Sequence, residues 1–119
     1  RLESAIADNK AVAILSDRDL KGKGVEVEFF GEATTLPPGP ATLAIRTGAP
    51  LLPVGCYFTN GGYRVVIRPP LEVPSTGSKS EKVTAMTQAL AHQLEDIIRQ
   101  APRQWHLVQP NWPSDGEAP

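Results

Sequence analysis

Apolar residues recur with different spacings along the chain, and these spacings predict both strands and helices. Residues 11–15 (AVAIL) form a short continuous apolar run, which predicts a strand buried on both faces. In residues 25–30, Val25, Val27 and Phe29 alternate with other side chains, which predicts a half-buried strand. Residues 51–68 contain two strand-like stretches around the tight-turn sequence Asn-Gly-Gly and therefore predict a β-hairpin.

Two short segments have a helical pattern instead. The apolar positions of residues 2–6 lie on one side at helical spacing, so the chain is predicted to open on the end of an amphipathic helix. Pro40 suits the first turn of a helix over residues 41–47. Gly48 is well placed to end that helix, and Pro50 prevents its continuation.

The longest helix is predicted after residue 78. Ser78 and Glu81 have the spacing of a capping box, and Pro102 ends the helix after about Ala101. Its apolar stripe consists of Val83, Met86, Leu90, Leu94, Ile97 and Ile98. The alternation of helices and strands along the chain predicts a mixed α/β fold.

Length and composition narrow the class of protein. A chain of 119 residues, with 40% hydrophobic and 21% charged residues, suits one compact domain. The formal net charge of −1 gives no basic field, so nucleic acid is not an expected partner. The single cysteine, Cys56, cannot form an internal disulfide, and no Cys/His cluster has zinc-ligand spacing.

The histidines and the cysteine are weak catalytic candidates. His92 and Asp96 are four residues apart on the predicted long helix, a spacing more typical of a surface hydrogen bond than of a catalytic couple. His106 lies between Trp105 and Leu107, where a packed or capping role is the favoured interpretation. Cys56 lies in an apolar strand pattern and is predicted to be a buried, unreactive thiol.

Two charged clusters are stronger candidates. Asp17-Arg18-Asp19 directly follows the predicted buried strand, where α/β sheets place functional residues. The two carboxylates can hold the guanidinium toward an anionic group, or the three can form a solvated ion pair, and the residues alone leave both open. Glu26 and Glu28 point to the same side of their strand, where charge also serves solubility.

Several spaced blocks within residues 17–71 resemble the bacterial lipid A biosynthesis acyltransferase family, part of the wider lysophospholipid acyltransferase group. The blocks are Asp17-Arg18-Asp19, GVEVEFFG from Gly24, PGPATLA from Pro38, TGAP from Thr47 and RPPL from Arg68. Residues 18–44, with APRQWH from Ala101 and QPNW from Gln109, are most similar to the actinobacterial phosphatidylinositol mannoside acyltransferases.

The resemblance implies a fold, a reaction and a location. The fold would be the C-terminal part of a lysophospholipid-acyltransferase-like α/β sandwich, with a mixed sheet flanked by helices. Residues 1–112 would belong to a single acyltransferase domain, and residues 113–119 would be a disordered tail. The reaction would move an acyl group from acyl-CoA to a mannose hydroxyl of the glycolipid acceptor, at the inner leaflet of the plasma membrane.

The same resemblance implies site residues. The family uses a His-x-x-x-x-Asp motif, but Ile97 follows His92 and Asn111 follows His106 at the aspartate position. The dyad is therefore expected in an N-terminal part of the same polypeptide, and this chain alone is expected to be inactive. Glu26 is the best match for the acidic residue opposite the dyad, followed by Asp17 or Asp19.

The remaining implied roles concern the substrate. Arg18 would hold the acceptor's anionic head or brace the carboxylate, and Thr47 and Gly48 would support the substrate channel. No metal or cofactor is expected, because a histidine base and a thioester leaving group suffice. Two alternatives stay open: a non-catalytic glycolipid- or protein-binding module of this fold, and a lipid A-type acyltransferase that uses acyl carrier protein.

Overall fold

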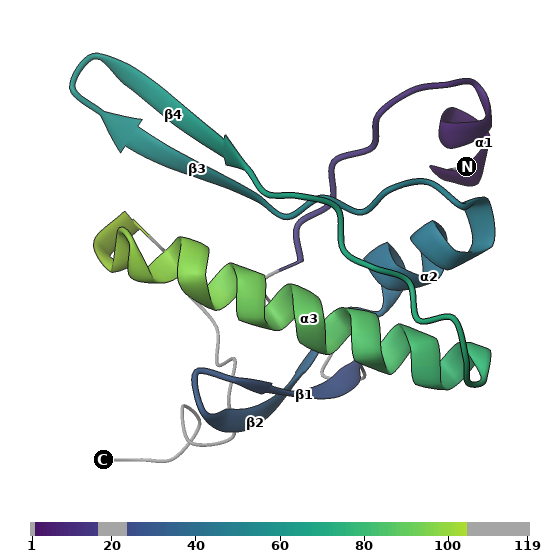
Figure 1. The fold of residues 1–119 in the computed structure, drawn as a ribbon. Coiled ribbons are helices and arrows are strands. Elements are labelled where there is room, and N and C mark those ends of the chain that lie inside the picture. The colour runs from purple at the N-terminus through teal and green to yellow at the C-terminus, as the bar shows by residue number, and fades with distance from the viewer. Residues whose placement is uncertain (1, 17–23, 105–119) are drawn as a thin grey trace.

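The structure is a computed structural model and describes residues 2–16 and 24–104. Its elements, in chain order, are α1 (Leu2–Ala7), β1 (Val25–Phe29), β2 (Glu32–Leu36), α2 (Gly39–Thr47), β3 (Val54–Thr59), β4 (Gly62–Ile67), α3 (Lys79–Arg99) and a 3₁₀ turn, η1 (Pro102–Gln104). The long helix α3 lies between two separate hairpins, β1–β2 on one side and β3–β4 on the other (Figure 1).

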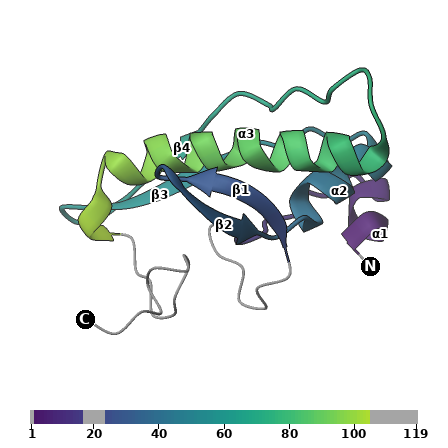
Figure 2. The ribbon, with the colours of Figure 1, turned by 90° about the horizontal axis from the view of Figure 1, so that it is seen from below.

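The first hairpin carries the larger part of the core. β1 and β2 are antiparallel, in a register that runs from Val25 opposite Leu36 to Phe29 opposite Glu32. The two-residue turn between them consists of Phe30 and Gly31, both at positive φ. The buried side chains of this hairpin pack on the middle of α3, and the core cluster consists of Val27, Phe29, Leu36, Leu90, Ala91 and Leu94. Figure 2 shows the hairpin lying along the helix.

The predicted half-buried strand is confirmed, but its partner strand was not predicted. Val27 and Phe29 are buried while Glu26 and Glu28 are exposed, as the alternation indicates. Residues 32–36 have the sequence EATTL, in which only Ala33 and Leu36 are apolar. That composition gives a weak strand signal, and the strand is fixed by its pairing with β1.

The second hairpin confirms the prediction for residues 51–68. β3 and β4 are antiparallel around Asn60 and Gly61, and Gly61 has a φ of 84°, the left-handed conformation that such turns require. The hairpin contacts α3 near its base. There, the Tyr57 hydroxyl donates a 2.6 Å hydrogen bond to the carbonyl oxygen of Ile97. A Cβ added to Gly55 would overlap Ile97 Cγ2, so only glycine allows this close approach.

The helix boundaries largely follow the sequence signals. In α3, the Ser78 hydroxyl accepts from the Glu81 backbone N–H and the Glu81 carboxylate accepts from the Ser78 N–H, which confirms the capping box. In α2, proline occupies the first turn and Gly48 caps the end at a φ of 75°. α3 ends at Arg99, slightly before the predicted end, and a short 3₁₀ turn follows.

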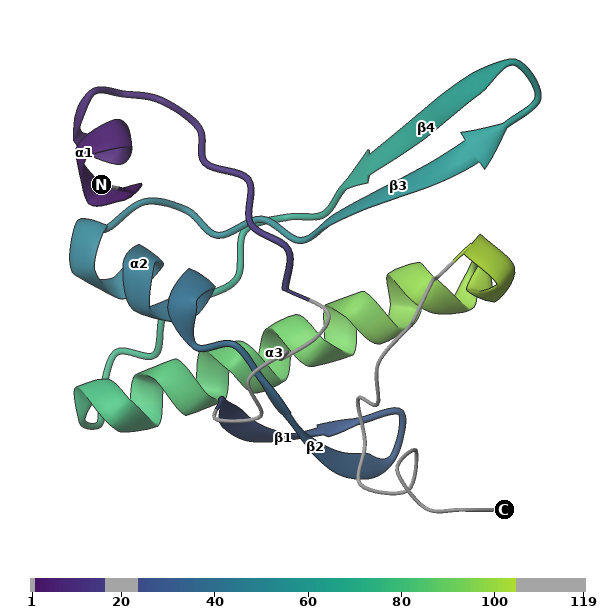
Figure 3. The same cartoon turned by 180° about the vertical axis from the view of Figure 1, so that it is seen from behind.

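Two predictions about buried residues are wrong. Residues 11–15 form no strand and are mostly exposed, with Leu15 at 89%. They follow an extended path past the base of the β3–β4 hairpin (Figure 3). A strand buried on both faces requires a neighbouring strand and a layer on each side, and the described residues supply neither. Cys56 is exposed as well, because its face of β3 is the one turned away from α3.

The described residues therefore form an α/β structure with two small antiparallel sheets. Residues 17–19 and His106, for which the sequence predicts roles, and the predicted tail over residues 113–119 lie outside the described residues.

Candidate functional site

A partly open cavity of about 850 Å³ lies where α2, α3, β3 and the segment of residues 10–16 meet. Its walls are formed mainly by aliphatic side chains. They include Leu43, Pro50, Leu51, Leu90, Leu94 and Ile97. The volume falls within the range of about 300–1,000 Å³ that is typical of small-molecule pockets. A cavity with such walls suits an apolar ligand.

Polar groups at the cavity are few, and three of them already have hydrogen-bond partners within the chain. The polar residues in the lining are Lys10, Ser16, Tyr57 and Gln104. The Tyr57 hydroxyl donates to Ile97, and the Gln104 side-chain amide accepts from the backbone N–H of Phe58 and donates to its carbonyl oxygen. These two side chains therefore present mainly carbon atoms to the cavity, which favours an alkyl chain over a polar ligand.

Ser16 connects the cavity to the first charged cluster by sequence. Asp17, Arg18 and Asp19 lie outside the described residues, but Ser16, directly before them, lines the cavity. The hydroxyl of Ser16 donates to the carbonyl oxygen of Ile14 at 3.2 Å. The predicted binding role of the three charged residues stays a prediction.

Glu26 lies on a different part of the molecule. It is exposed on β1 opposite Thr35, and it is not among the residues that line the cavity. Val27 and Phe29 point into the core against α3, so Glu26 and Glu28 project from the opposite face of the strand. The structure thus presents the Glu26 carboxylate to solvent, and its catalytic role stays a prediction.

Thr47 and Gly48 lie at the end of α2, next to the cavity in sequence. The Thr47 hydroxyl donates a 2.7 Å hydrogen bond to the Leu43 carbonyl oxygen and accepts one of 3.2 Å from the Ala49 N–H. The Gly48 N–H donates to the carbonyl oxygen of Ala44. Both residues shape the helix end from which Ala49 reaches the cavity wall, and a direct contact with substrate stays a prediction.

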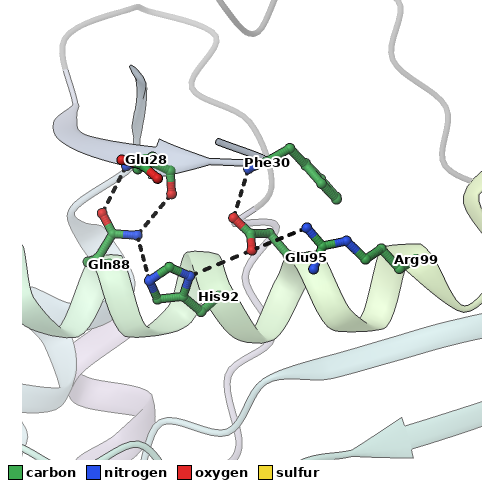
Figure 4. A network of polar contacts seen from close by, with 6 residues as sticks. All are labelled: Glu28, Phe30, Gln88, His92, Glu95 and Arg99. Carbon is green, nitrogen blue, oxygen red and sulfur yellow. Dashed lines mark hydrogen bonds and ion pairs between the residues drawn. The ribbon is translucent and has the colours of Figure 1, made fainter. Parts of the chain in front are cut away.

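The sequence did not predict a polar network that joins β1 to α3 (Figure 4). Gln88 Oε1 accepts from the Glu28 N–H at 2.8 Å, and Gln88 Nε2 donates to the Glu28 carbonyl oxygen at 2.9 Å. The buried Glu95 carboxylate accepts from the Phe30 N–H at 2.7 Å. These bonds satisfy backbone groups on the side of β1 away from β2, so they fix the hairpin on the helix.

His92 contacts two residues of this network, Gln88 and Glu95. His92 Nε2 lies 3.2 Å from Gln88 Nε2, and its Nδ1 lies 3.6 Å from Glu95 Oε2. Asp96 pairs instead with Arg68, at 2.7 Å. The couple of His92 with Asp96 that the spacing allows is therefore not formed, in line with the interpretation that it is not catalytic.

Residues 2–16 and 24–104 contain no group of three or more His, Cys, Asp or Glu side chains that could hold a metal ion. None of the helices in this part of the chain is long and apolar enough to cross a membrane.

The sequence assigns this α/β chain to a class of acyltransferases. Residues 1–114 match the family described as bacterial lipid A biosynthesis acyltransferase, so the chain belongs to that family and the resemblance is confirmed. Within the family, it is similar to proteins named phosphatidylinositol mannoside acyltransferase. The relative from Mycolicibacterium smegmatis is 44% identical over 96% of this chain, and the one from Mycobacterium tuberculosis H37Rv is 42% identical over 96%.

A third relative, from Mycobacterium tuberculosis CDC 1551, is 43% identical over 92% of this chain. The matched region is only part of each relative, covering 36%, 34% and 33% of their respective lengths. The chain thus spans about a third of the length of the curated relatives that it matches.

Proposed function

We propose that this chain is part of an enzyme that transfers a fatty acyl group from acyl-CoA to a mannose hydroxyl of a phosphatidylinositol mannoside. The observation that carries the proposal is the identity of 42–44% with relatives of that name over nearly the whole chain. The apolar cavity supports it, because an enzyme of this class has to bind a long alkyl chain away from water.

In this proposal the cavity receives the acyl chain of the donor or of the glycolipid. The aliphatic walls from α2 and α3 would bury the chain. The Asp17-Arg18-Asp19 segment, which directly follows Ser16, would meet the anionic part of the acceptor. Thr47 and Gly48 would keep the end of α2 in place at the substrate channel.

The chemistry would be completed by a His-x-x-x-x-Asp dyad from polypeptide beyond this chain. The histidine would take the proton of the acceptor hydroxyl while its oxygen attacks the thioester carbonyl carbon. The C–S bond then breaks, and the coenzyme A sulfur leaves and is protonated. Glu26 would supply the carboxylate opposite the dyad. The reaction needs no metal and no further cofactor.

The fold and the location of the complete enzyme are also part of this proposal. The chain would form the C-terminal part of a lysophospholipid-acyltransferase-like sandwich, in which its strands join a mixed sheet. The complete enzyme would act as a peripheral protein at the cytoplasmic face of the plasma membrane, where both substrates meet.

A transfer assay with the full-length enzyme tests the proposed reaction. Radiolabelled acyl-CoA and acyl carrier protein thioesters would be offered as donors, each with a phosphatidylinositol mannoside or a glucosamine-based acceptor. We expect label in the mannolipid from acyl-CoA. Transfer from acyl carrier protein to the glucosamine lipid would favour the lipid A-type alternative, and binding without any transfer would favour the non-catalytic module.

The role of Glu26 has its own matched control. Glu26 and Glu28 are both exposed on the same face of β1. We expect Glu26→Gln in the full-length enzyme to lower kcat by at least about 100-fold, the size of a typical acid–base contribution, and Glu28→Gln to leave it unchanged. Equal rates for the two variants would show that Glu26 is not the acidic residue of the site.

A further inference from the structure

Two polar side chains of α3 hold one edge of β1. Gln88 bonds both backbone groups of Glu28, and the Glu95 carboxylate accepts the N–H of Phe30, two residues further on. Because the direction of the backbone groups alternates along a strand, both attachments lie on the edge of β1 away from β2. The bonds on the other edge join β1 to β2 and move with the hairpin. The attachments to Gln88 and Glu95 therefore help to set where β1 lies relative to the helix.

Apolar packing by itself defines this position less well. Val27 and Phe29 are buried against the middle of α3, but the hydrophobic effect has no direction and tolerates a small shift along the helix. The two bonds from Gln88, at 2.8 and 2.9 Å, constrain both distance and orientation. A side-chain amide can make both, because it carries a donor and an acceptor on one planar group.

The second attachment stabilises a turn residue in an unfavourable conformation. Phe30 has a φ of 53°, in the left-handed region that costs free energy for any residue except glycine. The Glu95 carboxylate accepts its N–H at 2.7 Å, and the Arg99 guanidinium lies 5.1 Å from the centre of its ring. Glu95 is itself buried, with Arg99 at 3.8 Å and His92 Nδ1 at 3.6 Å from its Oε2. Figure 4 shows these contacts on one side of the helix, from which they hold both the strand and its turn.

Glu26 lies close to the first attachment along the strand. It precedes Glu28 by two residues, which span about 7 Å in a strand. Both carboxylates project from the face of β1 opposite the core. Because the two residues belong to one paired strand, a shift of the backbone at Glu28 also moves the Glu26 carboxylate. The bonds from Gln88 therefore affect where that carboxylate lies.

We propose that Gln88 and Glu95 are positioning residues for acyl transfer, which hold β1 so that the Glu26 carboxylate meets the reacting groups. The inference rests on the proposed function, in which Glu26 supplies the acidic residue of the site. Neither positioning residue lines the apolar cavity, so both act through the backbone of β1 and not on the acyl chain. A misplacement of about 1 Å at a reacting group can cost on the order of 100-fold in rate. Loss of either attachment should therefore lower kcat rather than raise KM.

Single variants of the full-length enzyme give the first test, with rates normalised to the folded fraction from circular dichroism. Gln88→Ala removes both bonds to Glu28, and we expect it to lower kcat about tenfold with the KM for acyl-CoA unchanged. Glu95→Gln keeps an oxygen that can accept the Phe30 N–H, so it should retain most of the turnover that Glu95→Ala loses. Gln93→Ala is the control on the same helix and should match the parent. A raised KM for Gln88→Ala, or an equal loss of kcat for Gln93→Ala, would overturn the proposal.

A double-mutant cycle separates positioning from a general loss of stability. Once Glu26→Gln has removed the carboxylate, a shift of β1 no longer misplaces a reacting group. We therefore expect Gln88→Ala to lower kcat about tenfold in the parent enzyme but less than about twofold in the Glu26→Gln background. The same factor in both backgrounds would show that Gln88 supports only the fold, and the positioning role would be refuted.

Amide hydrogen exchange adds a readout that does not depend on turnover. The peptide over residues 24–31 should exchange faster in Gln88→Ala than in Gln93→Ala, because an attached strand edge opens less often. Unchanged exchange would show that the bonds do not hold the strand, which would refute the positioning role alone. Full turnover by Glu26→Gln would instead refute both this inference and the role of Glu26 in the proposed function. The two failures are thus distinguishable.

Discussion

At the residue scale, two glutamine side chains take the place of neighbouring strands. Gln88 pairs with both backbone groups of Glu28 at the edge of β1, and Gln104 pairs with both backbone groups of Phe58 at the edge of β3. A primary amide has one donor side and one acceptor side, so it can replace a peptide unit of an adjacent strand. Each hairpin is thereby attached to the helical part of the molecule by hydrogen bonds.

Replacing Gln88 should show how much this pairing contributes to the free energy of unfolding. Gln88→Ala removes both bonds to Glu28, and we expect a loss of about 1 kcal/mol in the free energy of unfolding, because the freed backbone groups can bond to water. Gln93→Ala is the matched control. The Gln93 side chain is half-buried on the same helix and makes no hydrogen bond with the described residues. Urea denaturation of both variants would check this, and equal midpoints would show that the bridge contributes nothing.

The capping box of α3 makes the stability of the folded chain depend on pH, and the direction of this dependence follows from the pKa of Glu81. The backbone N–H of Ser78, followed by its side chain, holds the pKa of the Glu81 carboxyl below its ordinary value of 4.5. The folded chain therefore favours the carboxylate. This contribution to stability is complete above the unfolded-state pKa and is lost as the pH falls through the lower folded-state pKa.

The substitution Glu81→Gln isolates this effect. Glutamine keeps an oxygen acceptor for the Ser78 N–H but does not titrate. We expect the variant to lose less stability than the parent when the pH is lowered from neutral to below 4.5. Urea midpoints measured across that interval would check it. Parallel pH profiles for the two proteins would show that the capping carboxylate does not contribute to acid sensitivity.

At the element scale, the residues adjacent in the sequence are sufficient to predict some helices, strands and turns but not others. The β3–β4 turn, the cap of α3 and the Gly48 end of α2 each depend on a few adjacent residues, and all three could be predicted from the sequence. β2 and residues 11–15 depend on partners distant in the sequence. An apolar run such as AVAIL indicates that a segment needs burial, but it does not indicate which neighbour provides it.

Local sequence patterns are also insufficient to locate the candidate site. Sequence blocks predict Glu26 and Thr47 as site residues, and the structure places Glu26 on the exposed face of β1 and Thr47 at the end of α2. The cavity walls come from segments far apart in the chain, which no local pattern connects. The bridge from Glu28 to Gln88 likewise spans 60 residues. Contacts of this kind become visible only when the chain is folded.

Two leucines show how strongly packing determines the contribution of an element. Leu36 of β2 is fully buried against α3, whereas Leu15 is 89% exposed. We expect Leu36→Ala to lower the free energy of unfolding by about 2–5 kcal/mol, because it leaves a cavity in the core. The same change at Leu15 should stay within about 0.5 kcal/mol. Thermal or urea unfolding of the two variants would check this, and similar losses would mean that residues 11–15 are more buried than the structure shows.

At the scale of the whole molecule, α3 separates two regions of different character. Its contacts with β1 and β2 form a closed core from fully buried side chains. Its contacts with β3 and the segment before β1 leave a partly open apolar cavity, and some exposed side chains of the β3–β4 hairpin, such as Val54 and Ile67, line it. The first region gives the chain its own stability. The second leaves the apolar surface to which the proposed function assigns an alkyl chain.

The proposed role of the cavity leads to a prediction about substrate length. Ala49 is half-buried, lies in the loop after α2 and lines the cavity without belonging to either core cluster. Ala49→Phe should therefore reduce the space in the cavity with little effect on folding. In the full-length enzyme we expect it to raise the KM for long-chain acyl-CoA by about tenfold, equivalent to about two buried methylene groups, and to leave the KM for short-chain donors unchanged.

Val73→Phe is the control for that substitution, because Val73 is 49% exposed and lies outside the cavity lining. It adds the same aromatic ring to the chain without reducing the cavity. Steady-state kinetics with a series of acyl-CoA donors would separate the two variants. A similar change in KM at every chain length for Ala49→Phe would place the acyl chain elsewhere, and the aliphatic walls around α3 would then serve the packing of further polypeptide.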